Sequence, residues 1–281
     1  MRLRTEIAPG FVCRDEVAGH VLACGDASSV EFVGNLVSTL ATTPNLLLAD
    51  PPYGVSSEKE IRLVGRKAQF LSERWDLLTE AELADLLDRV ASLARDLRVG
   101  NAWIWTSDWW VSNVKRSLRD AGLSVWPTYV WCKPNPAQSV RKRCLASACE
   151  YLVMASGPQA IFDLDALPRQ RNWFVSDPDG TFRPAVSPGW VERAVVSQAE
   201  RLAREDGSDS LNRAQKPLDV TEALVRAGAP EGGLVLDLFG GTGTALIAAD
   251  RAKRRCVYVE RDPVQVRAAA SRLLLDRRER A

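Results

Sequence analysis

The sequence predicts an α/β fold with a Rossmann-like, doubly wound and mostly parallel sheet. Short apolar runs alternate with segments of helical period on both sides of residues 157–213, where this alternation fades. Several runs are apolar at nearly every position, as at 45–49, which is typical of parallel strands buried on both faces. The length of 281 residues suits one such domain with a modest insertion.

The elements before the insertion follow from apolar runs and helix-end signals. Apolar runs predict strands at 20–25, 45–49, 102–105, 125–131 and 151–155. Helical spacing predicts a helix at 27–40, and a capping box formed by Thr79 and Glu82 opens a second helix. A third helix, at 109–121, ends at Gly122. The polar stretch 55–74 has no period and is interpreted as a surface loop.

Regular structure resumes after the insertion, where Pro217 fits the first turn of a helix. Helices are expected at 218–227, from the glycine-rich turn through 252, and at 263–275, with strands at 233–239 and 256–260. We therefore expect residues 1–156 and 214–281 to form two halves of one domain, with 157–213 as an insertion that has its own local structure.

Composition and charge exclude several classes of protein. The 37 Lys and Arg nearly balance 36 Asp and Glu, so the chain is not a general polyanion binder, and nucleic acid would need a local basic patch. No apolar run reaches the roughly 18 residues of a membrane helix, and residues 1–10 do not resemble a secretory signal. The six cysteines form no C-x-x-C pair and His20 is the single histidine, so neither a metal site nor a histidine-dependent hydrolase is expected. We expect buried thiols in a reducing cytoplasm.

The glycine-rich turn predicts a site for a nucleoside cofactor. The strand that ends in Leu236-Asp237-Leu238-Phe239 runs through the turn 240–244 into a helix, whose first N–H groups point toward any ligand there. Glu260 ends the next strand, where an acidic side chain can accept both hydroxyls of a ribose. The alternative is a tight turn beside a solvent-facing glutamate. A P-loop NTPase is not expected, because its motif is absent.

The run Asp50-Pro51-Pro52-Tyr53 predicts a second site at a strand's carboxyl end. Two successive prolines cannot continue the strand, so the turn is rigid. A carboxylate, a proline carbonyl and an aromatic ring can then surround one flat polar group, such as the exocyclic amine of a nucleobase. The alternative is a structural turn with a packed tyrosine.

Together these two motifs resemble those of amino-group DNA methyltransferases. Asp50-Pro51-Pro52-Tyr53 is similar to the family's motif IV, and Phe239-Gly240-Gly241-Thr242-Gly243-Thr244 to its motif I. The order, with the catalytic motif first, resembles the circularly permuted β group. Asp26, Trp131-Cys132-Lys133, Glu150-Tyr151, Gln215-Lys216-Pro217 and Arg272-Leu273 resemble further family positions. The sequence departs from the family at Leu238, Cys149 and Asn212–Ala214.

The resemblance implies an S-adenosylmethionine-dependent methyltransferase of that fold. Residues 1–156 would be its catalytic half, 214–281 its cofactor half and 157–213 a small target-recognition region. The resemblance implies cofactor contacts from Asp26, Gln215, Lys216, Asp237, Phe239, Gly240, Gly241, Thr242, Gly243, Thr244 and Glu260. The small insertion predicts a short recognition sequence or help from a second subunit.

The implied reaction is methylation of the N6 amino group of adenine. A base inside a duplex cannot meet the methyl donor, so it must be flipped out. Tyr53 would stack on it, while Asp50 and the Pro51 carbonyl would accept its N–H groups and stabilise the growing positive charge. Asp50 favours adenine, and three alternatives stay open: an N4-cytosine enzyme, an RNA or single-strand enzyme, and a non-catalytic cofactor- or DNA-binding protein. A restriction partner also stays open.

Contacts to DNA would come from local basic residues. The candidates before and inside the insertion are Arg141, Lys142, Arg143, Arg169 and Arg171. The basic residues around Lys253 are interpreted as a helix end on the opposite face. Trp103 and Trp105 alternate along a strand and are interpreted as core residues, whereas Trp75 could close over the site.

Overall fold

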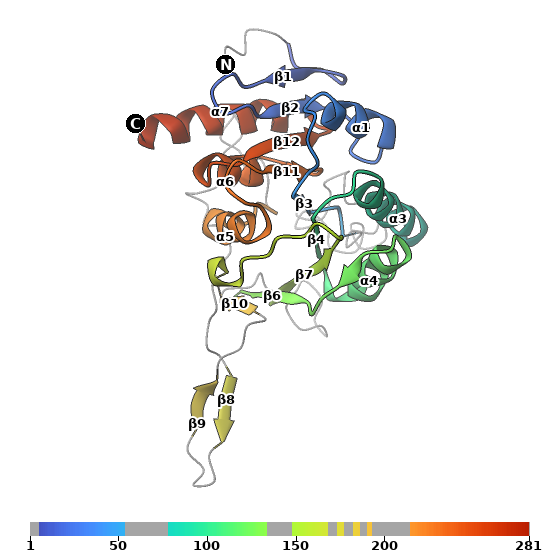
Figure 1. Ribbon diagram of the computed structural model, residues 1–281, viewed down its shortest axis with the longest axis vertical. Helices are drawn as coiled ribbons and strands as arrows, with labels where there is room; N and C mark the ends of the chain where they lie inside the picture. The colour runs from blue at the N-terminus through green and yellow to red at the C-terminus, as the bar shows by residue number, and fades with distance from the viewer. Residues whose placement is uncertain are drawn as a thin grey trace, which may run out of the picture.

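The computed structural model describes residues 6–53, 78–133, 148–167 and 214–280, and the backbone of three strands between 173 and 192. A central sheet carries helices on both faces (Figure 1). Its strands in chain order are β1 (Val12–Arg14), β2 (Val21–Cys24), β3 (Leu46–Ala49), β4 (Asn101–Thr106), β5 (Ser124–Val125), β6 (Tyr129–Cys132), β7 (Cys149–Ser156), β10 (Trp190–Glu192), β11 (Leu234–Asp237) and β12 (Arg255–Glu260). The strands β8 (Trp173–Ser176) and β9 (Phe182–Ala185) form a separate antiparallel pair.

The topology of the sheet confirms the predicted doubly wound α/β fold. In the described part of the chain its order is β1-β2-β12-β11-β3-β4-β7-β6-β10, with β5 paired to β7. The five strands from β2 to β4 are parallel, whereas β7 runs antiparallel to both β4 and β6. Because β11 lies between β12 and β3, strands from both ends of the chain meet at the centre of one sheet.

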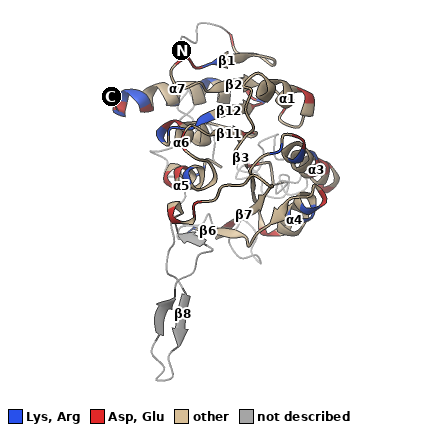
Figure 2. Cartoon of the chain, viewed as in Figure 1, with Lys and Arg blue, Asp and Glu red and all other residues tan. Residues whose placement is uncertain are grey.

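The helices bury two different faces of this sheet. The first face carries α1 (Val30–Ser38), α3 (Glu80–Asp96) and α4 (Val111–Asp120), and the second carries α5 (Leu218–Gly228), α6 (Thr244–Arg251) and α7 (Pro263–Arg280). Successive strand residues alternate between the two cores: Leu47 packs toward the first, and Leu46 and Leu48 toward the second. The predicted capping box at Thr79 and Glu82 is present at the start of α3. Charged residues lie mainly on the helices (Figure 2).

Several boundaries differ from the predicted ones. The expected strand at 125–131 is split into β5 and β6, because Pro127 has no N–H to donate to the ladder. The helix expected from 109 begins at Val111, after a 3₁₀ turn at Asp108–Trp110. The sequence analysis did not predict β1, an edge strand antiparallel to β2. The surface loop expected at 55–74 and Trp75 lie outside the described residues.

Two parts of the expected insertion contact the main domain. Phe162 packs edge-on against buried Trp103, with ring centroids 5.4 Å apart, and the N–H of Asp163 donates to Ala227 of α5. Farther along, β10 pairs in parallel with β6 and extends the sheet. The division of the chain at 157 and 213 stays a prediction. Within the described residues, no helix is long and apolar enough to cross a membrane.

Candidate functional site

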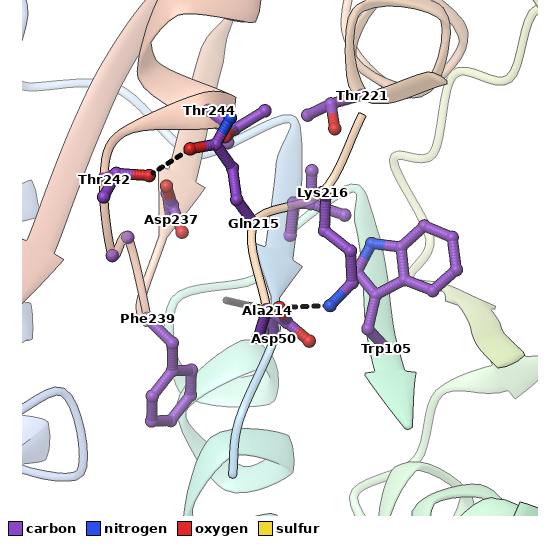
Figure 3. Close-up of a pocket in the computed structure, with 15 residues that line it drawn as sticks. Asp50, Trp105, Ala214, Gln215, Lys216, Thr221, Asp237, Phe239, Thr242 and Thr244 are labelled. Atoms are coloured by element: carbon purple, nitrogen blue, oxygen red, sulfur yellow. Dashed lines mark hydrogen bonds and ion pairs between the residues drawn. The ribbon is translucent and has the colours of Figure 1, made fainter. Parts of the chain in front are cut away.

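A cleft lies at the carboxyl ends of β3, β4 and β11, beside the segment that leads into α5. Its wall is made by Leu48, Ala49, Asp50, Trp105, Ala214, Gln215, Lys216, Thr221, Asp237, Phe239, Gly240, Gly241, Thr242, Thr244 and Ala245. Figure 3 shows Asp50 and Lys216 on one side of this cleft and Asp237, Gln215 and Thr242 on the other. The carboxyl edge of a parallel sheet is where ligands bind in this class of fold. The cleft thus unites the two motifs that the sequence placed almost 190 residues apart.

Asp50 follows β3 directly, and both of its carboxylate oxygens have partners. The hydroxyl of Tyr53 donates to Oδ1 at 2.7 Å. The ammonium of Lys216, which precedes α5, donates to Oδ2 at 2.5 Å (Figure 3). The Asp50 side chain is still 26% exposed, whereas that of Lys216 is 9% exposed. Asp50 is therefore the more accessible partner of this pair.

A second carboxylate, Glu150 at the start of β7, joins the same group. It accepts a hydrogen bond from Tyr53 at 3.2 Å and pairs with Lys216 at 3.1 Å. Lys133, which follows β6, pairs with its other oxygen. Two carboxylates and two ammonium groups thus form one cluster, called the charge cluster below: Asp50, Glu150, Lys133 and Lys216. The sequence analysis gave no role to Glu150 or Lys133, although both lie in segments that resemble family motifs.

Burial and mutual charge set the protonation of this cluster. Burial raises the pKa of Asp50, and the charge of Lys216 only partly opposes that effect. Burial acts in the same direction on Glu150, but there the ammonium groups of Lys216 and Lys133 prevail and hold its pKa below the usual range. Burial, together with both carboxylates, raises the pKa of Tyr53 well above its ordinary value. Tyr53 is therefore a neutral hydrogen-bond donor near pH 7.

Aromatic rings surround the ammonium groups. The Lys216 nitrogen lies 5.5 Å from the ring centre of Tyr53 and 5.8 Å from that of Trp105. Trp105 is buried, as predicted, and it also lines the cleft, which the sequence analysis did not foresee. Trp103, on the same face of β4, is entirely within the core.

The glycine-rich turn has the geometry of a ligand-binding turn. Gly243 has φ of +82° and caps the N-terminus of α6. A Cβ at Gly240 would lie 2.1 Å from the ring of Tyr258, so the turn accepts no side chain there. The N–H of Gly241 donates to Glu260 at 2.9 Å, which fixes the carboxylate at the end of β12. The turn and Glu260 therefore form one unit.

Asp237 is the buried acidic group of the second motif. It is 5% exposed, lines the cleft and accepts a hydrogen bond from the backbone of Phe239. Burial, followed by the charges of Glu260 and Asp50, raises its pKa well above the ordinary value. A cation in the cleft would favour the ionised form.

Other predicted residues are placed less directly. Gln215 accepts a hydrogen bond from Thr242 at 3.1 Å, which ties the segment before α5 to the glycine-rich turn. Asp26 follows β2 and is exposed. The N–H of its neighbour Gly25 donates to the carbonyl of Glu260, but Asp26 itself is not part of the cleft wall. The candidate DNA contacts Arg141, Lys142, Arg143, Arg169 and Arg171 lie outside the described residues.

A family model, a relative and two solved structures each match most of the chain. The family model described as DNA methylase, of the N6/N4 type, matches residues 45–271. The Type II methyltransferase M2.DpnII of Streptococcus pneumoniae is 24% identical over 236 residues, which cover 82% of each chain. The solved PvuII DNA methyltransferase, described as cytosine-N4-specific, has a TM-score of 0.63 at 15% identity and covers 96% of this chain and 90% of its own. M1.HpyAVI has a TM-score of 0.55 at 16% identity over 87% of this chain and 94% of its own. These two structures support the fold alone.

Proposed function

The chain belongs to the N6/N4 DNA methylase family, and within it we propose that this DNA methyltransferase acts on the N6 amino group of a flipped adenine. The methyl donor is S-adenosylmethionine. The observation that carries the proposal is the position of Asp50, accessible at the edge of the same cleft that contains the glycine-rich turn.

The first motif has the groups needed to hold an exocyclic amine. The Asp50 carboxylate and the Pro51 carbonyl are acceptors for its two N–H groups, and the ring of Tyr53 offers a face for stacking. Positive charge grows on the amine nitrogen as it forms the new bond. The carboxylate of Asp50 stabilises that charge and can take the proton that leaves afterwards.

The cleft also fits the donor. When bound, S-adenosylmethionine supplies a methyl group attached to a positively charged sulfur. The buried carboxylate of Asp237 suits a cationic ligand, and Glu260, held by backbone N–H groups, can accept ribose hydroxyls. Gln215, Lys216, Phe239, Gly240, Gly241, Thr242 and Thr244 line the same cleft and would form the rest of this site. We include Gly243, from the same turn, and Asp26, which follows β2, although neither lines the cleft.

Adenine is favoured over cytosine because the first motif begins with aspartate. The cytosine-N4-specific structural neighbour makes the N4 reaction on the same scaffold the second candidate. The matched relatives are named Type II methyltransferases, which supports a role in restriction and modification. A homodimer and a restriction partner are further proposals.

A labelled-donor assay tests the proposed reaction. The protein is incubated with S-adenosylmethionine labelled on its methyl group and with mixed-sequence duplex DNA, single-stranded DNA or RNA, and the nucleosides are then separated. We expect label in N6-methyladenine from duplex DNA. Label in N4-methylcytosine would make cytosine the target base in place of adenine. Label only in RNA or single-stranded DNA would change the proposed nucleic-acid substrate, and no label in any of them would reject the activity.

Replacement of Asp237 by asparagine is expected to weaken binding of S-adenosylmethionine at pH 7 by about tenfold or more, because a charged partner is lost. In the wild type, affinity rises with pH, since a cationic ligand favours ionised Asp237 and binding releases a proton. This dependence becomes shallower in the variant. Calorimetry in two buffers of different ionisation enthalpy measures both effects.

The control for this prediction is Asp85→Asn, at an exposed position on α3. Equal affinity and equal proton release in Asp237→Asn and wild type would contradict the assignment.

A further inference from the structure

In the charge cluster, the ammonium group that pairs with Asp50 opposes the role proposed for this carboxylate. Lys216 lies 2.5 Å from Asp50 and neutralises much of the negative charge that the reaction needs. Its ammonium would also repel the positive charge that grows on the target nitrogen. An arriving amino group therefore gains most if Lys216 moves away from Asp50.

Lys216 has another partner within a short displacement. Glu150 already lies 3.1 Å from its nitrogen, against 2.5 Å for Asp50. The Lys216 side chain is largely enclosed and its charge faces the rings of Tyr53 and Trp105, so escape to water is costly. A move between two carboxylates keeps the ammonium paired throughout.

We propose that Glu150 is a positioning residue for methyl transfer, which takes Lys216 over from Asp50 when the target amino group enters. The inference rests on the proposed transfer to an exocyclic amine and holds for adenine and cytosine alike. Lys133 pairs with the other carboxylate oxygen of Glu150, so the acceptor for Lys216 stays in place. The single hydroxyl proton of Tyr53 lies within reach of Asp50 at 2.7 Å and of Glu150 at 3.2 Å, so it can turn to Glu150 when Asp50 takes the substrate.

The structure also accounts for the direction of the exchange. The titratable groups that face Asp50 in the described residues are Lys216, Glu150, Tyr53 and Asp237. Two of them, Glu150 and Asp237, are acidic, so each disfavours the negative charge of Asp50. Asp50 binds an N–H donor from the substrate in place of the ammonium, while Glu150 retains full ionisation through its two lysines.

The central test removes the charge of Glu150. In Glu150→Gln, Lys216 stays on Asp50, so kcat at saturating cofactor should fall about tenfold or more. Because Asp50 loses a carboxylate neighbour and keeps the ammonium, its pKa falls, and the acid limb of the kcat profile should move down by about one pH unit. Glu150→Asp, which keeps the charge, should restore part of the rate. Glu222→Gln is the matched control and should change neither quantity, because Glu222 is a partly buried residue of α5 that pairs with Arg226 and is not part of the cleft wall.

A double variant separates charge exchange from a structural role. Glu150→Gln leaves the cluster with one excess positive charge, and adding Lys216→Met removes it. If Glu150→Gln is slow because Lys216 stays paired with Asp50, then Glu150→Gln/Lys216→Met should have a higher kcat than Glu150→Gln at saturating cofactor. A double variant no faster than the single one would overturn the proposal, since further loss is what a structural role produces.

One measurement does not depend on activity. Carboxyl-carbon NMR of the protein labelled at aspartate follows the titration of Asp50, with Asp50→Asn identifying its signal. The pKa of Asp50 should be about one unit lower in Glu150→Gln than in the wild type. An unchanged value would reject the coupling even if wild-type protein methylates DNA. Absence of methylation by the wild type would instead reject the proposed function, while the NMR result still decides the coupling.

Discussion

Replacement of Asp50 by alanine is expected to lower kcat for methyl transfer by about 100- to 1000-fold or more. The variant loses the acceptor that holds the target amine and the negative charge that stabilises the transition state. Lys216 keeps Glu150 as its partner in this variant, so the loss comes from the missing carboxylate itself. The measurement is single-turnover transfer of labelled methyl to DNA.

The affinity of Asp50→Ala for S-adenosylmethionine distinguishes a defect in methyl transfer from a disrupted binding site. Asp237, Glu260 and the glycine-rich turn are unaltered in Asp50→Ala, so affinity for S-adenosylmethionine should stay within a few-fold of wild type. The control is Asp85→Ala, because Asp85 is exposed on α3 and lies outside the cleft. Equal labelling by Asp50→Ala and wild type would remove Asp50 from the mechanism.

The sequence predicted the fold well where short-range patterns determine it. A continuous apolar run such as 46–49 is stable only as a strand that is covered on both faces. In the structure this run is the fully buried strand β3. The edge strand β1 has no such pattern, because one side of it faces solvent and its burial alternates. The pairing of β10 with β6 depends on residues about 60 positions apart, and no local pattern encodes such a contact.

The same distinction applies to the site. Asp50 and the turn 240–244 lie in compact motifs, so their neighbours in sequence reveal them. Glu150 and Lys133 are ordinary charged residues at strand ends, and their role depends on the antiparallel pairing of β6 with β7. The Lys216–Asp50 contact joins residues 166 positions apart. The sequence could indicate a border with the cofactor for Lys216, but not its pairing with the catalytic carboxylate.

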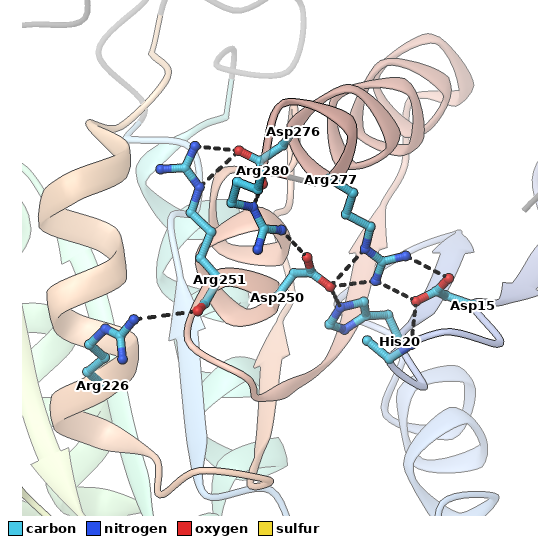
Figure 4. Close-up of polar contacts among 9 residues, drawn as sticks. Asp15, His20, Arg226, Asp250, Arg251, Asp276, Arg277 and Arg280 are labelled. Atoms are coloured by element: carbon cyan, nitrogen blue, oxygen red, sulfur yellow. Dashed lines mark hydrogen bonds and ion pairs between the residues drawn. The ribbon is translucent and has the colours of Figure 1, made fainter.

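A second cluster of charges, remote from the cleft, ties the N-terminal strands to α6 and α7 (Figure 4). Asp250 accepts from Arg277 and Arg280, each at 2.5 Å, and from His20 at 3.0 Å. The backbone N–H of Cys256 donates to Nδ1 of His20, so the other ring nitrogen carries the proton given to Asp250. Arg277 also reaches Asp15 at 2.7 Å.

The Asp250 cluster is expected to contribute strongly to stability. The Asp250 side chain is 7% exposed and His20 is fully buried, so removal of the carboxylate leaves the buried His20 N–H without its partner and takes one of its two carboxylates from Arg277. Asp250→Ala should therefore lower the free energy of unfolding by about 3 kcal/mol. Urea denaturation followed by circular dichroism measures this change. Asp85→Ala, which breaks an exposed pair, should cost less than about 1 kcal/mol.

The same cluster predicts how stability depends on acid. Burial opposes ionisation of Asp250, but His20, Arg277 and Arg280 prevail and hold its pKa well below the ordinary value, and Arg277 has the same effect on Asp15. A carboxylate with a lowered folded-state pKa contributes stability that is full above its unfolded pKa of about 3.9 and is lost as pH falls below it. Stability of the wild type should therefore drop steeply below about pH 4, and that of Asp250→Ala less steeply, because one of the two coupled carboxylates is gone. Parallel pH curves for the two proteins would show that Asp250 is not ionised against its arginines in the folded state.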